Sequence, residues 1–253
     1  MKQKTITILT TLFLFGQTFA QSIATTDFFT QIKNYDISTV LAADSIFADE
    51  ENMIERPPIL GFIGDNYQRL HIHFISIIKN PFNPYEYFAY GKTKVKNNIC
   101  EFQGIIKITD ARLYVEGDIP EYKQGYAECE VTLYEDSKQN ATGFFSGKLT
   151  TDFVIDNKGV FRYDAIYFVA DGFRNNQFVG NWTSYKTKST KKSNWGDCRI
   201  PESGTLDTGD GYFIVDERYV KNGWENFDRA WHTWNETPEV IKAQAKEYEK
   251  WWK

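Results

Sequence analysis

The chain has 253 residues, a formal net charge of −5 and an aromatic content of 17%. An acidic chain has no overall electrostatic attraction to nucleic acid or to anionic membranes, so we expect neither to be a partner. The length suits one large domain rather than two. The aromatic content suits β-structure and also suits stacking on sugars or other ligands.

The first twenty residues have the pattern of a secretory signal peptide. Lys2 and Lys4 give a positive start, 6–15 is a short apolar run, and Ala20 ends a stretch that a signal peptidase can cleave before Gln21. The run is too short to span a bilayer, which takes about 20 apolar residues. We therefore expect an exported protein, periplasmic or extracellular, with a signal peptide over 1–20 and no integral membrane anchor.

Three further stretches are expected to form one domain. These are an N-terminal helical segment over 21–66, an antiparallel β-barrel over 67–186, and a basic loop with a helical tail over 187–253 that packs on the barrel. In the first stretch, Phe28 and Ile32 have helical spacing.

The strand prediction rests on alternation and on the turns between the runs. In the first run Leu70, Ile72 and Phe74 share one face, and His71 and His73 lie on the other. Runs that succeed one another without helical crossovers pair antiparallel, and enough of them close into a barrel. We predict a mainly β fold, an antiparallel meander of about eight strands that forms a barrel or a strongly bent sheet. The expected runs are 69–79, 85–95, 99–109, 111–116, 126–135, 143–155, 160–169 and 177–186.

One short motif resembles a known family. The residues Gly180-Asn-Trp182 resemble the Gly-x-Trp signature of lipocalins and related calycins. In that family the signature lies near the first strand, whereas here it lies on the last predicted strand. Together with a ladder of strands and then a helix, the resemblance implies a calycin-like barrel, and such barrels hold small apolar ligands.

Beyond residue 186 the pattern changes. A basic loop is expected to carry Lys191 and Lys192, and two helices are expected over 217–234 and 238–252. Thr237 is the predicted N-cap of the second helix, with a proline at its first position.

The chain has three cysteines, so at most one intrachain disulfide forms. Cys100 and Cys129 both have the core-facing phase of their runs. They either form a bridge or remain buried thiols that act as small hydrophobic side chains. Cys198 lies after the strands and would be left unpaired.

Two histidines raise the question of a metal. His71 and His73 lie on one side of a strand, a spacing that zinc enzymes use together with a third ligand. His232 is the only other histidine, and it lies in the predicted tail. The alternatives are a solvent-facing pair or the site of a metal-dependent hydrolase. No other motif requires a cofactor.

The residues favour a non-enzymatic exported β-barrel that binds a small apolar or glycan ligand at or near its mouth. Trp182, Trp195 and Trp224 are the candidates for stacking, and Lys191 and Lys192 are the candidates for anionic groups. The alternative is a cell-envelope interaction or structural protein that docks a partner through its Trp-rich tail.

Overall fold

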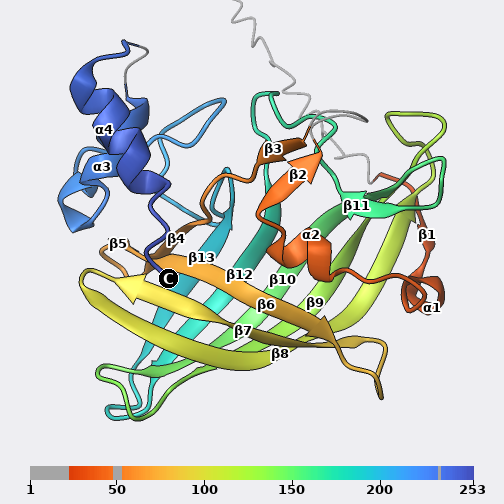
Figure 1. Cartoon of the computed structure of the whole chain (residues 1–253), viewed down its shortest axis with the longest axis horizontal. Coiled ribbons are helices and arrows are strands. Elements are labelled where there is room, and N and C mark those ends of the chain that lie inside the picture. Colours follow the sequence, from red (N-terminus) through yellow and green to blue (C-terminus); the bar gives the residue numbers. More distant parts are fainter. Residues whose placement is uncertain (1–22, 48–52, 233–234) are drawn as a thin grey trace, which may run out of the picture.

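The computed structural model describes residues 23–47, 53–232 and 235–253 (Figure 1). The expected signal peptide over 1–20 lies outside these residues. The fold is mainly β, with an antiparallel sheet curled into a half-barrel, a few short helices and a helical part near the C-terminus. This confirms the predicted fold class.

The elements occur along the chain in this order. The first five strands are β1 Thr25–Asp27, β2 Ser45–Phe47, β3 Met53–Glu55, β4 Leu60–Ile63 and β5 Gln68–Arg69. The later strands are β6 His71–Lys79, β7 Glu86–Val95, β8 Asn98–Tyr114, β9 Lys123–Glu135, β10 Gly143–Ile155, β11 Phe161–Tyr163, β12 Asn175–Ser184 and β13 Thr190–Asp197. The helices are α1 Phe29–Ile32, α2 Ser38–Ala42, η1 Val220–Asn222, α3 Glu225–Trp231 and α4 Pro238–Glu247.

The sheet curls back on itself at one corner. Its strands pair in the order β5-β4-β13-β12-β10-β9-β8-β7-β6, so β5 and β6 are the two ends of the path. Only Leu70 separates these two strands in the chain, and its N–H donates to the carbonyl of Gly61 at 2.9 Å. A side chain at Gly61 would be crowded because a Cβ would lie 3.0 Å from the Leu70 carbonyl and 3.1 Å from Trp195. Strands β4 and β6 therefore lie close together at this end of the half-barrel.

The main core fills the inside of the half-barrel.

One bulge explains why the sequence pattern predicts two strands where the structure has one. The predicted runs 99–109 and 111–116 form the single strand β8, with a register shift between Ile108 and Asp110. The inward phase moves from even to odd positions there, so that Ile106, Ile108 and Ala111 are all buried. A pattern based on strict alternation divides such a strand in two.

The first stretch contains more strand than the sequence predicts. Helices α1 and α2 are short, and the same stretch supplies β1, which pairs with β8, and β4, which pairs with β13. Strand β4 is buried at every position, so it lacks the alternation that marks a strand with one face in solvent.

The prediction of a basic loop for the two lysines is also wrong. Lys191 and Lys192 belong to β13, which pairs with β12 on one side and with β4 on the other.

In the tail, the predicted cap is confirmed: Thr237 Oγ1 accepts from the N–H of Val240 at 3.3 Å, with Pro238 at the first turn. No helix among the described residues is long and apolar enough to cross a membrane.

The cysteines are free thiols, so a bridge between Cys100 and Cys129, one of the two alternatives, is wrong. Cys129 lies opposite Ile108, which is eight residues along β8 from Cys100. At the rise of a strand this places the two cysteines about 27 Å apart, whereas a disulfide needs Cα atoms within about 7 Å. The other alternative, buried thiols packed in the core, describes both side chains.

Candidate functional site

A pocket of about 360 Å³ lies at the end of the half-barrel that contains the turn between β4 and β5. Its walls come from β4, β5, β7, β8, β9, β10, β12 and β13, so it lies on the inner face of the half-barrel rather than on its outer surface. The turns that join β7 to β8, β9 to β10 and β12 to β13 lie at this end, on the left of Figure 1. We call this pocket the barrel mouth.

Strand register explains why particular side chains meet there. Trp182 on β12 pairs with Phe145 on β10 and with Lys191 on β13, so all three share the inner face. Lys192 is one position further along and therefore points to the outer face, where it forms an ion pair with Glu202 at 2.8 Å. Register thus separates two neighbouring lysines into different environments.

Glu135, at the end of β9, is the most unusual residue of the mouth because it is an acid that is only 6% exposed. Three donors hold its carboxylate: Thr93 Oγ1 at 2.6 Å, the N–H of Gly143 at 2.9 Å and Trp182 Nε1 at 2.9 Å. Burial raises the pKa of Glu135, and these three hydrogen bonds oppose that rise. Among the described residues, no Lys, Arg or His side chain forms an ion pair with it.

Glycine at position 143 makes this arrangement possible. A Cβ there would lie 2.7 Å from the Trp182 ring and 2.1 Å from the carbonyl of Thr183, closer than real side chains come. With hydrogen in its place, the indole reaches across to the Glu135 carboxylate while the Gly143 N–H donates to the same group.

Two lysines stand at the rim of the mouth. Lys191 Nζ lies 6.0 Å from the centroid of the Trp182 ring, and Lys96 lies in the turn between β7 and β8. Both side chains are exposed, and neither forms an ion pair within the part of the chain that the structure describes. The mouth therefore combines a buried acceptor, an aromatic wall and a cationic rim.

The thiol of Cys100 also lines the mouth, and it accepts from Asn98 Nδ2 at 3.1 Å. Burial, with a further contribution from the nearby charge of Glu135, raises the pKa of this thiol to about 11. The thiol is therefore protonated at neutral pH and is a poor nucleophile.

The other two tryptophans predicted to stack on a ligand are buried elsewhere. Trp195 lies in the main core, stacked on Phe178 with 3.6 Å between ring centroids. Trp224 lies in a second core, where the guanidinium of Arg69 sits 4.1 Å from its ring centroid and its Nε1 donates to the carbonyl of Tyr67. Of the five predicted residues, the structure brings only Trp182 and Lys191 together.

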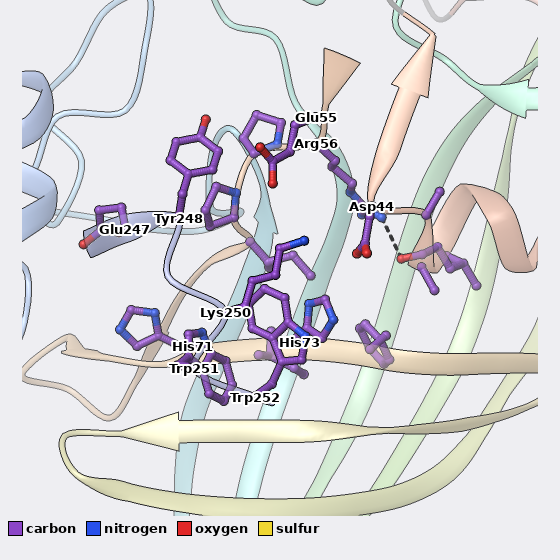
Figure 2. Close-up of a pocket in the computed structure, with 18 residues that line it drawn as sticks. Asp44, Glu55, Arg56, His71, His73, Glu247, Tyr248, Lys250, Trp251 and Trp252 are labelled. Atoms are coloured by element: carbon purple, nitrogen blue, oxygen red, sulfur yellow. Dashed lines mark hydrogen bonds between the residues drawn. The ribbon is translucent and has the colours of Figure 1, made fainter. Parts of the chain in front are cut away.

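The predicted histidine pair lies against the C-terminal segment rather than in solvent (Figure 2). His73 stacks on Trp252 with 3.6 Å between ring centroids, and His71 meets Trp251 edge to face at 6.0 Å. Burial lowers the pKa of both imidazoles, that of His73 to about 4. Both are therefore neutral at pH 7.

The space beside these histidines is small and has no metal-binding set. The cavity between β6 and the C-terminal segment measures about 70 Å³, room for about two water molecules. His232 lies after α3 and contacts Asp228 at 3.3 Å, with 69% of its side chain exposed. Within the described ranges, no group of three or more His, Cys, Asp or Glu side chains is placed to hold a metal ion.

A third hollow lies between the helical tail and the barrel. This apolar groove of about 640 Å³ is lined by Leu60, Phe213, Trp231 and Val240 among others, with Val169 at its edge. Val169 is 95% exposed, so the groove opens to solvent beside an apolar side chain.

Sequence reasoning missed Glu135, although a signal for it exists. The core-facing phase of β9 runs through Ala127, Cys129, Val131 and Leu133, and Glu135 is the next residue in that phase. An acid in line with four buried apolar residues indicates a polar group inside a barrel.

A scan against protein-family models and searches of curated proteins and of solved structures found no match to this chain.

Proposed function

We propose that this chain is an exported, non-enzymatic binding protein whose small ligand is held in the barrel mouth. The observation that carries the proposal is the convergence of Glu135, Trp182 and Lys191 around a cavity of about 360 Å³. Ligand pockets usually measure about 300–1,000 Å³ and combine apolar walls with a few polar groups, as this one does.

The energetics of Glu135 support the same proposal. Removing a carboxylate from water costs several kcal/mol when no cation compensates it, and an apolar residue of similar volume often serves stability better. The three donors offset part of this cost, and no cation among the described residues offsets the rest. Titratable groups perturbed by burial concentrate at functional sites, and this one faces a pocket.

Tryptophan fluorescence tests the proposal. A library of lipids, glycans and small metabolites is titrated against the native chain, Trp182→Phe and Trp231→Phe, each checked for folding by circular dichroism. We expect at least one compound to shift the emission of the native chain and of Trp231→Phe, and to shift that of Trp182→Phe much less. An equal response in both variants would place the ligand elsewhere, and no response to any compound would overturn the proposal.

Export is proposed from the leader pattern alone. Expression with the complete leader in a bacterial host, then N-terminal sequencing of the periplasmic and extracellular fractions, is expected to give a chain that starts at Gln21. An uncleaved chain confined to the cytoplasm would contradict this part of the proposal.

A second candidate function is partner docking through the tail, in a cell-envelope interaction or structural role. The observation that favours it is the apolar groove beside α3 and α4, with the exposed Val169 at its edge. The variant Val169→Asp places a charge there and is expected to abolish binding to an envelope protein that the native chain binds. The variant Val115→Asp, at another exposed position, is expected to retain that binding. Equal binding by both variants would remove this candidate.

The metal-dependent hydrolase alternative rests on His71 and His73, which pack against Trp251 and Trp252 and have no third ligand among the described residues. Elemental analysis of the purified protein decides it directly, since a folded preparation without stoichiometric metal would remove its main support.

A further inference from the structure

The charged side chains that line the barrel mouth differ in burial. Glu135 is buried, whereas Lys96 and Lys191 are exposed at the rim, and these three are the charged side chains among the described residues that line the mouth. A ligand in the mouth would therefore meet one buried acid and two exposed cations.

The Glu135 carboxylate can accept one more hydrogen bond. A carboxylate has about four lone-pair sites, and Thr93, Gly143 and Trp182 use three of them. A ligand hydroxyl and a ligand ammonium would both form a charge-assisted hydrogen bond with the carboxylate, but only the ammonium adds the attraction between opposite charges. A bound cation would also compensate a carboxylate that has no cationic partner in the described residues.

The walls and the rim define the rest of the ligand. The side faces of the mouth include the apolar groups of Ile63, Val95, Phe145 and Trp182, which suit an apolar body. At the rim, the Lys191 ammonium lies 6.0 Å from the Trp182 ring and forms no ion pair with any described residue, so it is available to an incoming anion.

We propose, on the basis of the proposed function, that the barrel mouth selects a small zwitterion with an apolar body. The ammonium group of the ligand faces Glu135, its apolar body lies against Trp182 and Phe145, and its anionic group faces Lys191 and Lys96. An α-amino acid with an apolar side chain is the simplest member of this class.

Isothermal titration with four matched probes tests this proposal. L-Phenylalanine carries both charges, phenethylamine only the ammonium, 3-phenylpropanoate only the carboxylate, and 3-phenylpropanol neither. We expect L-phenylalanine to bind at least about tenfold more tightly than either singly charged probe, because each of the two charge-assisted contacts accounts for about a factor of ten. We expect 3-phenylpropanol to bind most weakly.

Two variants assign the ends of the ligand. Lys191→Gln is expected to weaken L-phenylalanine and 3-phenylpropanoate and to leave phenethylamine unchanged, and Lys192→Gln is the matched control on the outer face. Glu135→Gln is expected to weaken the two probes that carry an ammonium. If Glu135→Gln does not fold, the exposed Lys191 still allows the test.

The outcomes separate this inference from the proposed function. Equal affinities for 3-phenylpropanol and L-phenylalanine, or equal effects of Lys191→Gln and Lys192→Gln, would overturn the zwitterion proposal. Failure of all four probes to bind would also overturn it. In each case the proposed function stands or falls separately, on whether other library compounds give a response that depends on Trp182.

Discussion

The barrel mouth and the C-terminal contact with β6 use similar parts for different purposes. Each sets a titratable group against an indole, the buried Glu135 with Trp182 in one case and the half-buried His73 with Trp252 in the other. At the mouth the indole N–H bonds to the carboxylate and leaves a cavity of about 360 Å³, whereas on β6 the two rings stack and leave about 70 Å³. The first arrangement leaves room for an occupant, and in the second the chain's own C-terminal segment fills the space.

The largest effect is expected from Trp182→Ala at the mouth. Trp182 is 9% exposed, and its truncation removes a large buried ring together with one of the three donors to Glu135. We expect the free energy of unfolding to fall by about 3–5 kcal/mol, the usual range for a buried tryptophan changed to alanine. Urea denaturation measures this, and a loss below about 1 kcal/mol would show that the mouth is not packed as described.

A smaller effect is expected from Trp252→Ala at the C-terminal contact. Trp252 is only half buried, and its main contact is the stacking on His73. We expect the free energy of unfolding to fall by about 1–2 kcal/mol, from a stacked pair plus partial burial. Ligand binding at the mouth is expected to be unchanged. A loss of binding in a variant that remains folded would contradict the separation of the two sites.

The C-terminal contact is also expected to make stability depend on pH. Burial is the main cause that lowers the pKa of His73 to about 4, with Asp44 opposing it and Arg56 and Lys250 adding to it. Unfolded His73 binds its proton near pH 6.5 and folded His73 near pH 4, so the unfolded state holds more protons between these values. Stability is therefore expected to fall as the pH drops from about 6.5 to about 4, and His73→Gln is expected to show a smaller fall. Urea midpoints across this range provide the check, and identical profiles would contradict the assignment.

The mouth is expected to respond to pH with the opposite sign. Because burial raises the pKa of Glu135, the unfolded state loses this proton first as the pH rises from about 4.5. The stability that Glu135 contributes is then fully present below the unfolded pKa and is lost as the pH rises through the folded one. The stability difference between the native chain and Glu135→Gln is therefore expected to be more favourable to the native chain at low pH. A difference that grows with pH instead would show that the three donors outweigh burial.

Much of the fold could be predicted from the sequence because alternation reports directly which side chains face the core. The inward phases of Cys100, Cys129 and Phe145 are confirmed on this basis. The bulge in β8 and the pairing of β4 with β13 could not be predicted, since neither a shift of phase nor a contact between distant segments leaves a periodic signal. The position of Lys191 on a strand could not be predicted for a similar reason, because a run of polar residues on a strand resembles a loop.

The candidate site was predictable only in part. Trp182 and Lys191 do meet, but Trp195 and Trp224 are core residues, because an indole suits a core as well as it suits a binding surface. Glu135 was the residue most open to prediction, since it occupies a core phase that apolar residues hold elsewhere on β9.

The smallest effect on stability, and the most direct test of the central claim, comes from two neighbouring lysines. Lys191 faces the mouth and Lys192 faces outward, so Lys191→Glu and Lys192→Glu make the same change of charge on opposite sides of one strand. Both substitutions are expected to change the free energy of unfolding by no more than about 0.5 kcal/mol. For an anionic compound whose fluorescence response depends on Trp182, we expect Lys191→Glu to lower the affinity about tenfold and Lys192→Glu to leave it unchanged. Equal effects of the two variants, or no effect of either, would contradict a ligand site inside the barrel mouth.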